Sequence, residues 1–263
     1  MFRLNKFLFL FSISMILLIS CAALRKQDKP TLFLIGDSTV KNGKDKGDGG
    51  LWGWGHFLGD YFDSDKITVL NKALGGTSSR TFRNNPGLWD SVLVKIKPGD
   101  FVMMQFGHND SSPLDDSARA RGTIRGNGNE SKEIYNPIKK KKEIVYTYGW
   151  YLRQFIADVK AKGATPIVCS LIPRDAWNAG KVRRDDYAVW AKEAAEQGGA
   201  YFIDLNKLVA DEYDRLGEEK VKELYFGPKD KTHTLLEGAK LNAEKVVEGV
   251  KQTKGLKLVN AIK

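Results

Sequence analysis

Four short polar motifs hold the residues of this 263-residue chain that are best suited to chemistry. Ser38 follows a glycine and an aspartate at the end of an apolar run, and Asp230 and His233 lie three positions apart near the C-terminus. A serine can attack an ester carbonyl when an imidazole takes its proton and a carboxylate holds that imidazole in the right tautomer. Gly76 and Asn109 lie in the other two motifs and offer amide donors for an oxyanion. These residue types predict ester cleavage through a serine.

The apolar runs of the chain predict the elements that position these motifs. Five short, β-branched runs alternate with longer stretches of helical periodicity, which predicts a parallel sheet covered by helices on both faces. Ligands collect beyond the carboxyl ends of the strands in such a sheet, and three of the four motifs follow a predicted strand directly. The expected strands are Thr31–Gly36, Ile67–Asn71, Asp100–Phe106, Thr165–Leu171 and Tyr201–Asp204. The expected helices are Leu51–Phe62, Leu88–Lys95, Val145–Lys162, Asp185–Gln197 and Leu235–Val250.

Residues 110–142 interrupt this alternation, because they are polar and show no sustained period. A long insertion without regular structure is usually functional or mobile. Its arginines either contact an acidic ligand or form solvated surface, and the four lysines 139–142 are expected to be plain surface. Arg80 has two open interpretations as well, either a contact to a uronate carboxylate or a structural ion pair. The arginines of the insertion are Arg119, Arg121 and Arg125.

Two histidines and three tryptophans are further candidates. His108 precedes Asn109 and is expected to hold it by packing or hydrogen bonding, whereas His56 lies between aromatic residues and is expected to be structural. An aromatic ring can stack on a sugar, but it can equally fill the core. Both interpretations stay open for Trp52, Trp54 and Trp177.

The N-terminal segment has the pattern of an export signal. Arg3 and Lys6 precede an uncharged run, Phe7–Ile19, which is shorter than the roughly 20 apolar residues of a membrane-spanning helix. The following residues resemble a bacterial lipoprotein box, in which Cys21 becomes the lipidated N-terminus. We therefore expect residues 1–20 to be a signal peptide, 21–30 a tether and 31–263 the catalytic domain. The expected location is a membrane-anchored lipoprotein in the periplasm or on the cell surface.

The composition argues against a nucleic-acid partner, a disulfide and a metal site. Lys and Arg outnumber Asp and Glu by 42 to 32, but the basic residues are scattered, so no nucleic-acid partner is expected. With Cys21 lipidated, Cys169 has no partner for a disulfide. Three histidines are too few for a metal cage built from Cys and His. We expect no metal and no other cofactor.

Taken in order from Thr31 to about Val250, the motifs resemble those of the SGNH hydrolase (GDSL-type esterase) superfamily. The resemblance rests on Gly-Asp-Ser-Thr, Gly-Gly-Thr-Ser-Ser-Arg, Gly-His-Asn-Asp and Asp-Lys-Thr-His. It implies a flavodoxin-like, three-layer α/β sandwich with a five-stranded parallel sheet. It also implies that Ser38 is the nucleophile, Asp230 the acid and His233 the base. The implied oxyanion donors are the backbone amides of Ser38 and Gly76 and the side chain of Asn109.

Within that superfamily the motifs are most similar to those of rhamnogalacturonan acetylesterases, which implies removal of acetyl groups from pectin. The alternatives are an acetylesterase for another glycan such as xylan, a lipase or thioesterase, and a non-catalytic glycan-binding lipoprotein. A lipase or thioesterase needs a hydrophobic acyl channel, which the polar, Arg-rich insertion disfavours. A non-catalytic protein is expected to have lost a triad residue, and all three are present. The expected partner is an acetylated polysaccharide or oligosaccharide.

Overall fold

A five-stranded parallel sheet lies at the centre of the computed structural model, which describes residues 29–44 and 46–263. The strand order is β2-β1-β3-β6-β9. The chain turns to one side after β1 and to the other side from β3 onward, so the order reverses between β1 and β3. Such a reversal opens a crevice at the carboxyl ends of the two strands. The strands are β1 (Thr31–Gly36), β2 (Thr68–Asn71), β3 (Phe101–Gln105), β6 (Thr165–Cys169) and β9 (Tyr201–Ile203).

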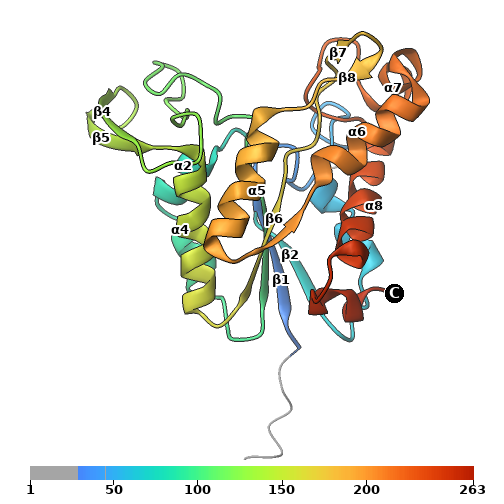
Figure 1. Ribbon diagram of the computed structural model, residues 1–263, viewed down its shortest axis with the longest axis horizontal. Coiled ribbons are helices and arrows are strands. Elements are labelled where there is room, and N and C mark those ends of the chain that lie inside the picture. Colours follow the sequence, from blue (N-terminus) through green and yellow to red (C-terminus); the bar gives the residue numbers. More distant parts are fainter. Residues whose placement is uncertain (1–28, 45) are drawn as a thin grey trace, which may run out of the picture.

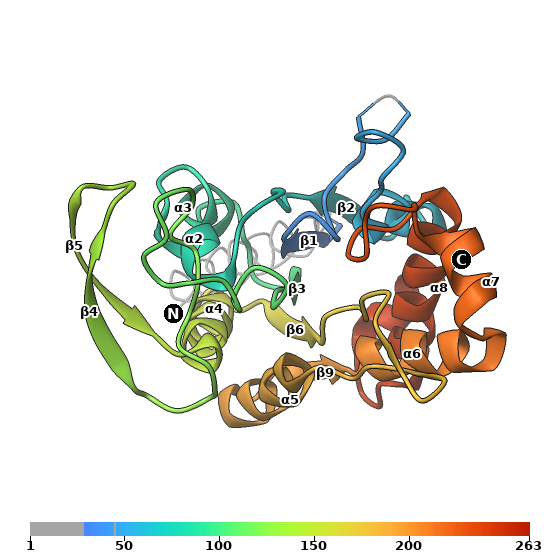
Figure 2. The same ribbon diagram turned by 90° about the horizontal axis from the view of Figure 1, so that it is seen from above.

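Helices cover both faces of the sheet, as Figures 1 and 2 show. In β1, Leu32 and Leu34 contribute to one hydrophobic core, and Phe33 and Ile35 contribute to the other. This alternation follows from the two-residue period of a strand that is buried on both sides. One face carries α2 (Ser79–Asn84), α3 (Trp89–Leu93), α4 (Tyr148–Ala161) and α5 (Asp186–Gly198). The other carries η1 (Trp54–His56), η2 (Leu58–Tyr61), α6 (Leu205–Leu216), α7 (Glu218–Tyr225), α8 (Leu236–Gln252) and η3 (Lys257–Ala261).

The predicted three-layer sandwich and its five parallel strands are confirmed, but the helix expected over Leu51–Phe62 is wrong. That segment forms the two short 3₁₀ helices η1 and η2 instead. Its glycines lie against the backbone that follows β1: a Cβ on Gly53 would lie 2.4 Å from the Lys41 carbonyl oxygen, and one on Gly55 would lie 2.4 Å from the Val40 carbonyl oxygen. The absence of a Cβ allows this close approach of the two backbones, and glycine also destabilises a regular helix.

The insertion contains regular structure that its polar sequence does not indicate. It ends in an antiparallel hairpin of β4 (Ser131–Asn136) and β5 (Lys141–Tyr146), so β5 takes the first residues of the helix predicted from Val145. A second small hairpin pairs β7 (Trp177–Asn178) with β8 (Lys181–Val182). Figure 1 shows both hairpins at the upper end of the molecule, beyond the carboxyl ends of the central strands.

The N-terminal predictions fall outside this structure. Cys21, the proposed signal peptide and all but the end of the tether lie before residue 29, where the description begins. In the part that is described, no helix is both long and apolar enough to cross a membrane. Cys169 lies buried at the end of β6 as a free thiol, and its burial raises the pKa of that thiol.

Candidate active site

Ser38 lies in the tight turn that follows β1, at the point where the strand order reverses. The turn comes close to β3, because a Cβ on Gly36 would lie 2.6 Å from the carbonyl oxygen of Gln105. Asp37 is fully buried beneath it, and its Oδ1 accepts hydrogen bonds of 2.8 Å from both the backbone amide and the hydroxyl of Thr39. These contacts fix the turn while the Ser38 side chain faces the pocket.

The three residues proposed for proton transfer lie in one hydrogen-bonded row. His233 Nε2 is 2.7 Å from Ser38 Oγ, and His233 Nδ1 is 2.7 Å from Asp230 Oδ2. The other carboxylate oxygen of Asp230 accepts the backbone amides of Thr232 and His233, each at 2.8 Å. Asp230 is thereby held by its own turn, and it orients the ring so that Nε2 faces the serine.

The environment of Asp230 keeps it ionised. Partial burial alone raises the pKa of this carboxyl. The backbone amides of His233 and Thr232 and the His233 ring donate hydrogen bonds to the carboxylate that lower the pKa by a larger amount. The pKa of Asp230 is therefore below its ordinary value. A carboxylate that stays charged accepts the Nδ1 proton of a neutral imidazole. This leaves Nε2 free to accept the proton of Ser38.

Gly76 and Asn109 lie beside Ser38 and line the same pocket, whose volume is about 730 Å³. Gly76 has a positive φ of 82°, and its N–H makes no hydrogen bond to any residue in the described ranges. Asn109 uses its side-chain NH₂ to donate a 2.7 Å hydrogen bond to the carbonyl oxygen of Thr77. That bond fixes the orientation of the amide and leaves its second hydrogen for an oxyanion.

Behind Asn109, a buried carboxylate joins the loop after β3 to the start of α2. Asp110 accepts hydrogen bonds from the backbone amide of Gly107 at 3.0 Å and from the backbone amide of Ser79 at 3.1 Å, and the Ser79 hydroxyl also contacts it. Burial outweighs these hydrogen bonds and raises the pKa of Asp110 to about 7. The loop that carries Asn109 is thus attached directly to α2.

His108 is buried in the wall of the pocket, and neither ring nitrogen has a hydrogen-bond partner among the residues described. Burial, followed by the positive charge of Arg174, lowers the pKa of His108 well below its usual value. The backbone carbonyl of His108 accepts a 2.9 Å hydrogen bond from Arg174. The backbone next to Asn109 is thus held by Arg174, and the His108 ring makes no hydrogen bond to Asn109.

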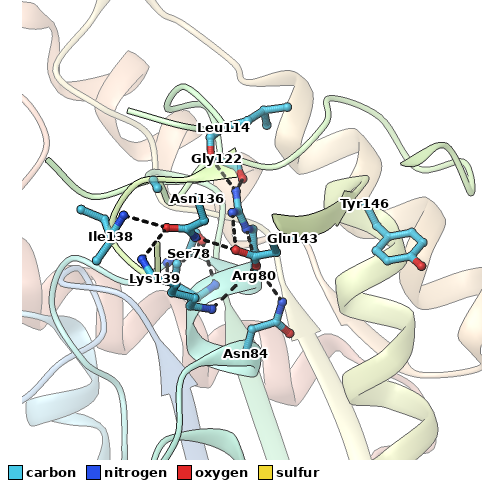
Figure 3. A network of polar contacts seen from close by, with 12 residues as sticks. Ser78, Arg80, Asn84, Leu114, Gly122, Asn136, Ile138, Lys139, Glu143 and Tyr146 are labelled. Carbon is cyan, nitrogen blue, oxygen red and sulfur yellow. Dashed lines mark hydrogen bonds and ion pairs between the residues drawn. The ribbon is translucent and has the colours of Figure 1, made fainter. Parts of the chain in front are cut away.

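Of the two interpretations of Arg80, a uronate contact or a structural ion pair, its surroundings support the ion pair (Figure 3). The side chain is fully buried and forms an ion pair with Glu143 of β5, with Nη2 2.8 Å from Oε2. Its Nη1 donates to the carbonyl oxygens of Leu114 and Gly122 at 2.8 and 2.9 Å. Arg80 is thus a structural residue that connects α2 to both ends of the segment 114–122, and it does not line the pocket.

The tryptophans and His56, which the sequence left as candidates, have structural contacts outside the pocket. Trp54 is buried and donates through its indole N–H to Gln105, and Trp177 donates in the same way to Asp175. Trp52 packs against His56, with 4.7 Å between the ring centroids. None of these four aromatic side chains lines the pocket around Ser38, although Lys41 and Arg174, which the sequence did not single out, do.

The sequence and the fold together define the class of protein. The model of the GDSL-like lipase/acylhydrolase family matches residues 34–235 of this chain. The chain therefore belongs to this family and is a carboxylic ester hydrolase.

Particular relatives narrow the comparison. The probable rhamnogalacturonan acetylesterase YesY of Bacillus subtilis is 33% identical, over 88% of this chain and 96% of the relative. The rhamnogalacturonan acetylesterase of Emericella nidulans is 29% identical over 84% of each chain. The crystal structure of the protein YxiM from Bacillus subtilis matches with a TM-score of 0.68 and 29% identity, over 85% of this chain and 56% of that one. The chain thus spans little more than half of that longer protein.

Proposed function

We propose that this protein is a rhamnogalacturonan acetylesterase, a serine esterase that removes acetyl groups from pectin. The observation that carries the proposal is the pair of 2.7 Å hydrogen bonds linking Asp230, His233 and Ser38 beside an open, polar pocket. Similarity to two rhamnogalacturonan acetylesterases over most of their length supports the choice of substrate.

In the proposed mechanism the Ser38 oxygen attacks the acetyl carbonyl while His233 Nε2 accepts the hydroxyl proton. The negative charge that forms on the carbonyl oxygen is stabilised by the amides of Ser38 and Gly76 and by the side chain of Asn109. His233 then returns the proton to the sugar oxygen as the ester bond breaks. Water then gives a proton to His233 as its oxygen attacks the acetyl carbonyl. His233 passes this proton to Ser38 Oγ as the acyl bond breaks, which restores the serine hydroxyl and releases acetic acid, which ionises to acetate. This sequence of steps uses no cofactor.

The lining of the pocket favours a sugar ester over a lipid. Ala118 and Ile138 are the apolar side chains in a lining that otherwise consists of glycines, polar groups and charged groups. A lipase or thioesterase requires a hydrophobic channel for its acyl chain. An acetyl group needs no such channel, and a sugar ring is compatible with polar walls.

The test is acetate release from acetylated rhamnogalacturonan, acetylated xylan and 4-nitrophenyl acetate at matched ester concentrations. We expect the highest kcat/KM on rhamnogalacturonan. Equal values on all three would contradict the pectin assignment and leave the esterase assignment standing. No release from any of them would contradict both.

We also propose that the enzyme is an exported lipoprotein held to a membrane through Cys21 and facing the periplasm or the cell exterior. The support is the sequence alone: two cations, an uncharged run over Phe7–Ile19, and a cysteine directly after Leu18-Ile19-Ser20. An exported esterase of this kind would meet its polysaccharide outside the cytoplasm.

A further inference from the structure

Two arginines of the insertion converge on the residue proposed to hold the oxyanion. Arg121 Nη1 donates a 3.1 Å hydrogen bond to the carbonyl oxygen of Gly76. Arg119 Nη1 lies 3.3 Å from the position that a Cβ on Gly76 would occupy. Both guanidinium groups therefore stand at the edge of the pocket, within a few ångströms of the site where the ester carbonyl would bind.

The described lining of the pocket carries an excess of positive charge at this edge. Four cationic side chains line the pocket, and its described lining contains no Asp or Glu. Lys41 forms an ion pair with Asp48, and Arg174 contacts Thr232 and the backbone of His108. The lining cations are Lys41, Arg119, Arg121 and Arg174.

Neither arginine of the convergent pair has an acidic partner in the ranges that the structure describes. The Arg121 side chain donates only to neutral oxygens, the hydroxyl of Ser112 and the carbonyl of Gly76, and the exposed Arg119 guanidinium makes no hydrogen bond or ion pair. Asp116 is close in sequence, but its oxygens accept the backbone amides of residues 118–120. Partial burial, and after it the charge of Arg119, lowers the pKa of Arg121, and the opposing effect of the carboxylates of Asp116, Asp37 and Asp110 does not cancel this decrease. A bound anion would relieve this repulsion.

The segment that carries the two arginines is held in place from both sides. Arg80, which is completely buried, binds the carbonyl oxygens of Leu114 and Gly122, the residues that flank this segment (Figure 3). Between them Ala120 is buried with a φ of 43°, a conformation that costs energy for a residue other than glycine. The arginines are therefore presented by a fixed turn, which lowers the entropic cost of binding.

We propose that Arg119 and Arg121 form a subsite for the carboxylate of a uronic acid in the substrate, placed beside the acetyl group that is removed. The inference rests on the proposed function and deepens it, because it assigns the selection of an anionic sugar to the insertion. Guanidinium groups match the planar geometry of a carboxylate and form charge-assisted hydrogen bonds with it. A neutral glycan such as xylan leaves both charges without a partner.

The test compares an acetylated rhamnogalacturonan oligosaccharide with the same oligosaccharide whose uronate carboxyls are methyl-esterified, with acetate release as the measure. The enzyme should prefer the free acid by about tenfold or more in kcat/KM. Arg119→Gln and Arg121→Gln should each remove most of this preference, chiefly through KM on the free acid. Arg125→Gln is the matched control, because Arg125 lies on the same insertion but pairs with Asp186 and is absent from the pocket lining. It should keep the parent's preference.

Equal kcat/KM on the free acid and the methyl ester in the parent would overturn the subsite, as would an unchanged preference in both arginine variants. Arg119 is exposed, so Arg119→Gln should fold normally and remains informative even if Arg121→Gln does not. If the parent cleaves 4-nitrophenyl acetate but neither oligosaccharide, the proposed substrate is wrong. Calorimetric titration with an unacetylated galacturonate oligomer then decides the subsite separately: binding that Arg119→Gln abolishes supports it, and no binding to the parent contradicts it.

Discussion

Replacing Glu143 with glutamine should destabilise the domain, because it leaves the buried Arg80 guanidinium without its charged partner. The side chains of Arg80 and Glu143 are 1% and 10% exposed, so solvent screens the pair only weakly. Partial burial alone raises the pKa of Glu143, but Arg80, Asn136 and Lys139 outweigh it and lower that pKa from 4.5 to about 2. At about 1.4 kcal/mol per pKa unit, this difference in pKa corresponds to a stabilisation of the folded state by about 3 kcal/mol at neutral pH. Breaking buried ion pairs typically costs about 3–5 kcal/mol.

Urea and thermal unfolding of the parent and of Glu143→Gln measure this loss, and at about 2–4 °C per kcal/mol the melting temperature should fall by about 6–12 °C. The difference should also depend on pH. Because the folded-state pKa is depressed, the carboxylate contributes its full stabilisation above about pH 4.5 and loses it as the pH falls toward about 2. The gap in unfolding free energy between parent and variant should therefore be constant from pH 7 to about 5 and narrow below that.

Glu133→Gln is the matched control, since Glu133 lies on the same hairpin and pairs with Lys142 at an exposed site. Its effect should stay below about 1 kcal/mol. The double variant Arg80→Met with Glu143→Gln should lose less than the two single variants added together, because it leaves no unpaired buried charge. A loss of less than about 1 kcal/mol in Glu143→Gln, or a gap that does not change with pH, would refute the reasoning.

Three further predictions concern the proposed chemistry and location. Ser38→Ala should abolish acetate release and leave the melting temperature nearly unchanged, since a hydroxyl in a pocket-facing turn supports little of the core; near-normal turnover would refute the mechanism. Asp230→Asn should lower kcat by roughly 10⁴, because the amide can leave the imidazole in the wrong tautomer, and a variant that keeps the parent's rate and pH profile would refute the role of Asp230 as the orienting acid. Cys21→Ala should abolish labelling by a radioactive fatty acid and release the protein from the membrane fraction, and normal membrane retention would count against the anchor.

The sequence predicts the central sheet well, because strands buried on both faces must be apolar throughout. β1 coincides with the predicted Thr31–Gly36, and the motifs after β1 and β3 meet at the reversal of strand order. The hairpin of the insertion is different: most of β4 is exposed, so no apolar pattern marks it. For Arg80 the sequence leaves a uronate contact and a structural ion pair both open, since its partner Glu143 follows 63 positions later and only the tertiary fold brings the two charges together.

The hydrogen bond between Ser38 and His233 joins positions 195 residues apart, so it closes nearly the whole domain into one loop. Closing a loop of that length depends on the strands between its ends being in place, because contacts so distant in sequence form late and at an entropic cost. Ser38 leaves the ribosome early, whereas its base follows the last strand of the sheet. An unfinished or unfolded chain therefore holds a serine of ordinary reactivity. Catalytic turnover would therefore report that folding is complete, and an incompletely folded chain would be inert toward esters around it.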